Sequence, residues 1–193
     1  GVSLFIQESL EYTVREDLCH MDKHIESLFI EIDKSHIGKN KNVIVGVLYR
    51  PPNTDIKMYI EHMTDILSKI KAEKKISYLL GDFNIDLFNI DKHPPSQEFV
   101  DLMYANRLIP TITKPTRVTT KSATLIDNIF CNSILNNENI FSGLLYTDIT
   151  DHFPIFHIDY SSTLPIKPMH MKKRIVSSQN IEKFNTAIES QDW

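Results

Sequence analysis

Three short polar stretches lie at the ends of apolar runs in this chain, and their side chains suit phosphate and cation chemistry. They are Tyr49-Arg50-Pro51-Pro52, Gly81-Asp82-Phe83-Asn84 and Thr150-Asp151-His152. A rigid strand end can hold oxygen and imidazole groups in the arrangement that phosphate and a divalent cation require. The first hypothesis is therefore a site that binds phosphate and a divalent cation.

Asp82 and Asn84 form the most suggestive pair. They are two residues apart on an extended segment, so their side chains leave the same face. The carboxylate can accept a proton from water, and the amide can donate to a phosphate oxygen. The same residues also fit an ordinary Gly-Asp-x-Asn turn after a strand. The pattern alone leaves both interpretations open.

Asp151 and His152 are adjacent, so they can serve different partners. A carboxylate suits Mg²⁺, and a protonated imidazole can donate to a scissile phosphate. Asp127 lies inside an apolar run, where a buried charge needs a partner. We expect it to pair with His152 and to fix the tautomer of that ring. The alternatives are a surface turn for Asp151 and His152, and an outward position on an edge strand for Asp127.

Tyr49 ends a run of β-forming residues, and Pro51-Pro52 stiffens the chain beyond it. Its phenol can donate a hydrogen bond to a phosphate oxygen. The alternative is a half-buried aromatic residue that closes a strand.

The elements that position these residues are strands alternating with amphipathic helices. Apolar runs predict strands at residues 2–6, 28–32, 43–49, 76–80, 125–130, 140–145 and 153–158. Apolar residues at helical spacing predict one helix over residues 56–70, with Asn53, Thr54 or Asp55 as its N-cap, and another that starts at Pro94. Strands outnumber helices and several are adjacent in sequence, which favours an α/β fold of mixed sheets with flanking helices over a doubly wound parallel sheet.

The bulk composition narrows the partners. The formal net charge is −4, so no overall positive field draws the chain to nucleic acid. The two cysteines, Cys19 and Cys131, cannot build a disulfide framework and indicate a reducing compartment. No apolar run approaches the roughly 20 residues of a membrane span, and the first residues do not read as a signal peptide. We expect an intracellular protein with no membrane partner.

The order of the motifs resembles a known superfamily. Tyr-Arg-Pro-Pro, Gly-Asp-Phe-Asn, Ile-Asp-Asn-Ile-Phe and Thr-Asp-His follow one another as in the endonuclease/exonuclease/phosphatase superfamily. Residues 1–160 are similar to the apurinic-type endonuclease domain of LINE-like (non-LTR) retrotransposon polyproteins, a branch that Tyr49-Arg50-Pro51-Pro52 favours. Residues 161–193 resemble the linker and short helix that lead toward the reverse transcriptase segment of these polyproteins.

This resemblance implies a fold, an activity and partners. The fold is a DNase I-like α/β sandwich of two sheets with flanking helices. The activity is the nicking of target DNA by phosphodiester hydrolysis, which frees a 3′-hydroxyl to prime reverse transcription. The partners are DNA, Mg²⁺ (with Mn²⁺ as the alternative) and the reverse transcriptase segment, and the location is nuclear when the protein acts on DNA.

The resemblance also implies a role for each matching residue. Tyr49 contacts the scissile phosphate, Asp82 activates the attacking water, and Asn84 orients water and phosphate.

The remaining matches come from the second half of the domain. Asp127 supports His152, which contacts the phosphate, and Asp151 helps hold the metal. Thr124 matches a position that supports the site or contacts DNA. Thr150 stands where serine is more usual and keeps the hydroxyl group.

The chain departs from the family upstream of these motifs. The family begins with a strand that carries a catalytic Asn, followed by a strand that ends in a metal-binding Glu, and neither has a candidate here. Residues 2–6 resemble the next strand, so we expect an N-terminally incomplete domain with impaired activity. Two alternatives stay open: a catalytically inactive remnant or binding module, and a lipid or inositol phosphate phosphoesterase of the same superfamily.

Overall fold

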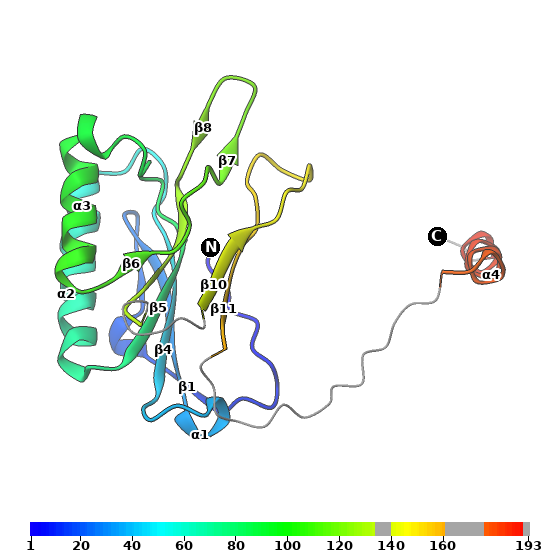
Figure 1. Ribbon diagram of the computed structural model, residues 1–193, viewed down its shortest axis with the longest axis horizontal. Coiled ribbons are helices and arrows are strands. Elements are labelled where there is room, and N and C mark those ends of the chain that lie inside the picture. The colour runs from blue at the N-terminus through cyan, green and yellow to red at the C-terminus, as the bar shows by residue number, and fades with distance from the viewer. Residues whose placement is uncertain (134–139, 161–175, 191–193) are drawn as a thin grey trace.

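The computed structural model describes residues 1–133, 140–160 and 176–190. A seven-stranded sheet forms its centre, with the spatial order β1-β3-β4-β5-β9-β6 and with β2 paired to β3 outside this path (Figure 1). The strands of this sheet are β1 (Tyr12–Val14), β2 (His20–Met21), β3 (Glu26–Ile32), β4 (Val43–Tyr49), β5 (Ile76–Asp82), β6 (Ile109–Pro110) and β9 (Asp127–Cys131).

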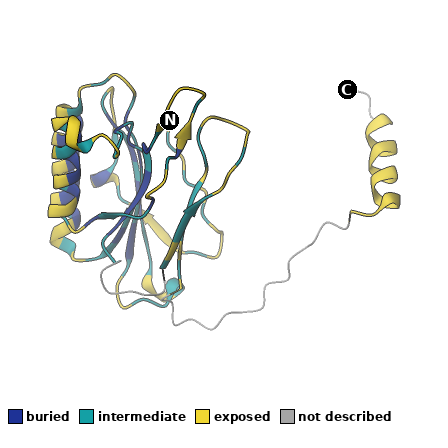
Figure 2. Ribbon diagram, turned by 45° about the horizontal axis from the view of Figure 1, so that its top comes forward, coloured by how far each residue is buried: buried dark blue, intermediate teal, exposed yellow. Residues whose placement is uncertain are grey.

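The only parallel pair within this sheet, β4 and β5, is joined by the long helix α2 (Ile56–Glu73). Asp55 caps the start of α2 by accepting a hydrogen bond from the Lys57 N–H at 2.9 Å. Helix α3 (Pro94–Ala105) lies beside α2 on the same face of the sheet (Figure 1). Both helices turn a buried side to the sheet and an exposed side to solvent (Figure 2), as the spacing of their apolar residues predicts.

Aromatic packing under these helices fixes the end of β5. The ring of Phe83 meets that of Phe130 edge-on, with centroids 5.2 Å apart, and Phe99 of α3 meets Phe130 at 5.8 Å in the same way. Edge-to-face pairs add about 0.5–1.5 kcal/mol each beyond the area they bury. Phe83 stands between Asp82 and Asn84, so this cluster anchors the turn that carries both polar residues.

A two-stranded antiparallel ribbon, β10 (Ile140–Leu144) and β11 (Ile155–Asp159), lies over the other face of the sheet (Figure 1). Tyr78 of β5 donates to the Asp159 carboxylate at 2.5 Å, and its ring packs at a tilt against that of His157, with centroids 5.1 Å apart. A small hairpin of β7 (Arg117–Val118) and β8 (Ala123–Thr124) projects at one end.

The remaining helical elements are short or separate from the core. They are η1 (Glu16–Leu18), α1 (Lys34–Ile37), η2 (Ile90–Lys92) and α4 (Ser178–Glu189). No residue of α4 is buried. No helix among the described residues is both long enough and apolar enough to cross a membrane.

The predicted α/β class, with two layers of strands and flanking helices, is confirmed, and the second layer contains β10 and β11. The predicted strand at residues 2–6 is wrong, since this segment has no strand structure. Alternating apolar residues make a strand only where a neighbour completes the backbone hydrogen bonds, and none of the described strands pairs with it. The predicted linker at residues 161–175 lies outside the described residues.

Candidate active site

Three of the predicted site residues stand in one row across the sheet. Tyr49 on β4 is the register partner of Asp82 on β5, and Asp82 is the partner of Asp127 on β9. Register partners project from the same face of a sheet. Leu48 and Phe83, next in sequence to Tyr49 and Asp82, are buried in the core under the helices. The row therefore faces away from the helices.

His152 joins this row from a loop. Its Nδ1 lies 3.0 and 3.2 Å from the two carboxylate oxygens of Asp127, so the hydrogen bond expected between these residues is present. Possible ligand atoms of Asp82, Asp127 and His152 all lie within 4.8 Å of one another. With Nδ1 engaged by Asp127, Nε2 is the ring atom left for a substrate.

The loop that carries His152 is held by its neighbours. The Phe153 N–H donates to the Thr116 carbonyl at 2.7 Å, and Arg117 forms a β-bridge with His152. The Thr150 hydroxyl accepts from the His152 N–H at 3.1 Å and donates to its carbonyl at 3.0 Å. Thr150 therefore shapes the turn that presents the imidazole.

Asn84 is bound directly to Asp82. Its backbone N–H donates to one carboxylate oxygen of Asp82 at 2.9 Å, and its Nδ2 donates to the other at 3.2 Å and to the Arg50 carbonyl at 2.8 Å. Its φ of 47° is left-handed, a region that asparagine tolerates better than most residues. Asn84 thus fixes the orientation of the Asp82 carboxylate.

Arg50 is a residue whose importance the sequence interpretation missed. It is 5% exposed. Its guanidinium donates to the carbonyls of Phe83 at 2.8 Å, Asn84 at 2.6 Å and Thr54 at 2.9 Å. Burial lowers the pKa of this group. The signal was present in the sequence, because a cation between a buried strand and two prolines has little access to solvent.

The electrostatics of Asp82 reflect its surroundings. Burial raises its pKa, the Asn84 N–H opposes that rise, and the nearby Asp127 carboxylate adds to it. A raised pKa strengthens the ionised carboxylate as a base. Two neighbouring carboxylates also repel each other, and a cation between them would relieve that repulsion.

Asp151 and Thr124 lie beside this cluster. The Asp151 carboxylate accepts a hydrogen bond from Arg117 Nε at 2.7 Å, both side chains are about half exposed, and the arginine lowers the pKa of Asp151. Thr124 is the register partner of Arg117 in the β7–β8 hairpin. The metal role of Asp151 and the substrate contacts of Thr124 and Thr150 stay predictions.

Two further residues were missed. Glu26 is the register partner of Tyr49 on β3 and so extends the row by one strand. Thr116 is fully buried, and its hydroxyl accepts from the Asp127 N–H at 3.0 Å. The strand prediction for residues 28–32 began two positions too late to reveal Glu26.

The donor set fits the cation that the resemblance implies. Carboxylate oxygens suit Mg²⁺ and Mn²⁺, and Asp82 and Asp127 supply them at the same edge of the sheet. Among the residues with described positions, this is the one group of three or more possible ligands close enough to share an ion.

Comparisons with known proteins agree with this architecture. The endonuclease domain of TRAS1, a telomere-specific non-LTR retrotransposon, superposes with a TM-score of 0.59 at 17% identity, over 78% of this chain and 68% of that one. A 3′-5′ exonuclease from Neisseria meningitidis has a TM-score of 0.50 at 14% identity, over 78% of this chain and 70% of that one.

The chain therefore has the fold of endonuclease/exonuclease/phosphatase proteins, as its motifs predict. A structure with this fold is the endonuclease domain of the TRAS1 retrotransposon. No family model matches the sequence. No curated protein matches it either.

Proposed function

We propose that the chain is the metal-dependent DNA endonuclease domain of a non-LTR retrotransposon. It nicks target DNA by phosphodiester hydrolysis, and the new 3′-hydroxyl primes reverse transcription. The observation that carries the proposal is the cluster of Asp82, Asp127 and His152 at one edge of the sheet, in a fold like that of the TRAS1 endonuclease domain.

In this proposal each residue of the site has a role. Asp82 accepts the proton of the attacking water, and its raised pKa suits it to act as a base. Asn84 holds that carboxylate in place. Asp127 orients His152, whose Nε2 donates to the scissile phosphate, and the Tyr49 phenol donates to the same group.

A divalent cation, when bound, neutralises charge that develops on the phosphate. The carboxylates of Asp82 and Asp127 would hold it, with Asp151 as the further predicted ligand. Mg²⁺ is commonly held by only one or two carboxylates together with substrate phosphates. A small protein ligand set is thus compatible with this chemistry.

The proposal extends to the tail and to the location of the protein. Helix α4 exposes Ile181, Phe184 and Ile188, at 48%, 63% and 40% of their surface. Their spacing places them on one face of the helix. An exposed apolar face supports residues 161–193 as a connection that docks on the reverse transcriptase segment. Action on target DNA requires a nuclear location.

Nicking of supercoiled plasmid tests the proposal, with the full-length product of the reading frame and Mg²⁺. We expect nicked circles that disappear with chelator and in Asp82→Ala. Asp101→Ala, a carboxylate removed from the exposed side of α3, should nick normally. Cleavage of inositol phosphates without nicking would favour the phosphoesterase alternative. Absence of any hydrolysis from a folded protein would favour the inactive remnant or binding module.

A further inference from the structure

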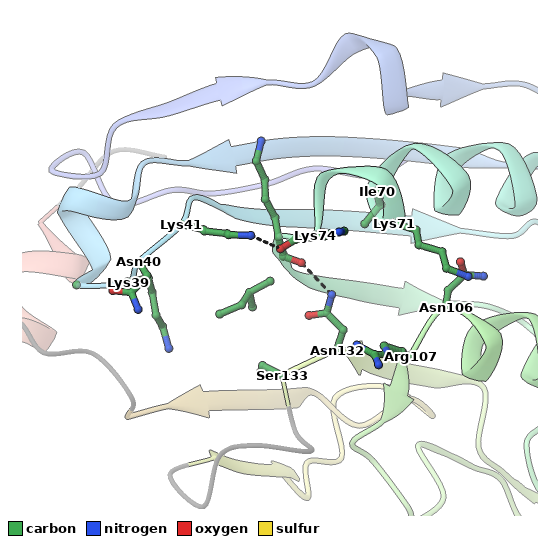
Figure 3. A pocket seen from close by; sticks show the side chains of 13 residues that line it. Lys39, Asn40, Lys41, Ile70, Lys71, Lys74, Asn106, Arg107, Asn132 and Ser133 are labelled. Carbon is green, nitrogen blue, oxygen red and sulfur yellow. Dashed lines mark hydrogen bonds between the residues drawn. The ribbon is translucent and has the colours of Figure 1, made fainter.

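A hollow lined by basic residues lies beside the start of β5 (Figure 3). Its volume is about 800 Å³. It is lined by Ile76, the first residue of β5, whereas Asp82 is the last residue of that strand. At about 3.3 Å per residue, the hollow and Asp82 lie about 20 Å apart along β5.

The lining is one-sided in charge. It is made by the loop before β4, the ends of α2 and α3, and the residues after β9 (Figure 3). Six of the described lining residues are cations, and none of the other described ones is acidic. These cations are Lys39, Lys41, Lys71, Lys74, Lys75 and Arg107. This cluster gives the hollow a positive local charge in a chain whose net charge is −4.

Only part of this charge is neutralised by the protein. Lys75 pairs with Glu31 and Glu73. Lys39 pairs with Asp159.

The other four cations have no carboxylate within 4.0 Å in the described parts of the chain. Lys41 and Lys71 donate to the carbonyls of Lys74 and Ala105, both at 3.2 Å. Lys74 and Arg107 are the remaining two, and they line the hollow from the ends of α2 and α3.

The backbone supplies a second, independent observation. Lys74 and Arg107 have φ values of 51° and 63°, at the ends of α2 and α3. Glycine is the usual residue in this conformation at a helix end, and asparagine is the usual exception. The other two non-glycine residues with positive φ among the described residues are asparagines. At two helix ends, therefore, this chain carries a cation where the backbone favours glycine.

We propose that the hollow is a second nucleic-acid contact, which binds the phosphodiester backbone without reading its sequence. The cations meet phosphate oxygens, and Asn40 adds a further amide to the lining. No aromatic residue is among the described residues that line the hollow, so base stacking is not part of the proposed contact. The choice of nucleic acid over an acidic protein rests on the proposed function.

The backbone conformation makes a sharp test available. Lys74→Gly together with Arg107→Gly removes two charges and also relieves two strained positions. The thermal midpoint of the variant should equal or exceed that of the parent. Its affinity for a fluorescein-labelled DNA duplex, measured by anisotropy in chelator at about 50 mM salt, should fall about tenfold. The slope of log affinity against log salt should lessen by about 2.

The matched control removes two charges near the starts of α2 and α3, since Lys57 is in the first turn of α2 and Lys92 ends η2, just before α3. Lys57→Gln with Lys92→Gln should leave affinity and salt slope close to those of the parent, since both side chains are exposed and lie away from the hollow. Unchanged binding by the glycine variant would overturn the proposal. So would equally effective competition by polyglutamate, which would assign the hollow to an acidic protein.

The DNA-binding test of the hollow and the nicking test of the proposed function can fail independently. Asp82→Ala should abolish nicking and leave the binding contribution of the hollow intact. If the parent protein never nicks DNA but the glycine variant binds DNA more weakly than the parent, the proposal for the hollow stands and the proposed nuclease function fails. If the glycine variant nicks normally and binds DNA as the parent does, the nuclease function stands and the proposal for the hollow fails.

Discussion

Arg50→Ala is the substitution by which the turn at the active site can be tested most directly. Arg50 is nearly fully buried, and its guanidinium serves the carbonyls of Phe83, Asn84 and Thr54. Removing it leaves these three acceptors without their donor. The Asp82–Asn84 turn would then keep its internal hydrogen bonds, its bonds to the backbone of residue 50 and of Ile126, and the packing of Phe83.

The magnitude follows from these contacts. An unsatisfied buried polar group costs about 1–3 kcal/mol, and water that enters the vacated space recovers part of this. Three acceptors therefore give a loss of roughly 3–5 kcal/mol in the free energy of unfolding. A domain of this kind has about 5–15 kcal/mol in total, so the variant should fold but unfold at much lower denaturant.

Urea unfolding of Arg50→Ala, Arg50→Lys and the parent measures this loss. The lysine variant should recover only part of it, because an ammonium cannot reproduce the planar fork that reaches three carbonyls. Arg117→Ala is the matched control, and its loss should be much smaller, since its pair with Asp151 is half exposed. A loss below about 1 kcal/mol for Arg50→Ala would refute the idea that these bonds hold the turn.

Three further predictions concern the same region. In Gly81→Ala the new Cβ would lie 1.8 Å from the Leu48 carbonyl oxygen, so we expect a loss of about 3 kcal/mol or more in urea unfolding, and near-parent stability would contradict the packing described. Because the pKa of Asp82 is raised in the folded state, the folded protein holds its proton more tightly, and stability falls as pH rises from about 4 through the raised pKa. Asp82→Asn removes this pH-dependent contribution of Asp82 to the free energy of unfolding. The stability of the variant relative to the parent should therefore rise between pH 4 and pH 7 in urea titrations, and a difference that is constant with pH would contradict the raised pKa. Mg²⁺ should raise the thermal midpoint, by the equivalent of about 2.7 kcal/mol at a hundred times its dissociation constant, and Asp127→Asn should abolish this shift, whereas an equal shift in the variant would place the ion elsewhere.

The central elements could be predicted from the sequence because their signals are local. The run at residues 43–49 matches β4, and the apolar spacing after Asp55 matches α2. Burial on one face imposes a period that the sequence displays directly. The pairing of Asp127 with His152 was also foreseeable, since a carboxylate in an apolar run needs a partner.

Other features depend on contacts between distant segments. Strands β7 and β8 have two residues each, too short to show a period. The pair of Arg117 with Asp151 joins residues 34 positions apart through that hairpin. The position of Glu26 beside Tyr49 follows from strand register, which residue types alone do not specify.

The alignment of Glu26, Tyr49, Asp82 and Asp127 in one register makes the site sensitive to chain length as well as to residue identity. Side chains alternate between the two faces of a strand, so one residue inserted within β5 would turn Asp82 toward the helices and Phe83 toward the substrate. An insertion of the same size between Val118 and Ala123, at the tip of the β7–β8 hairpin, leaves this alternation unchanged. Descendants of this chain can therefore gain or lose single codons at the hairpin tip. An insertion or deletion within one of the four aligned strands must contain an even number of residues, so that the site residues keep their face of the sheet.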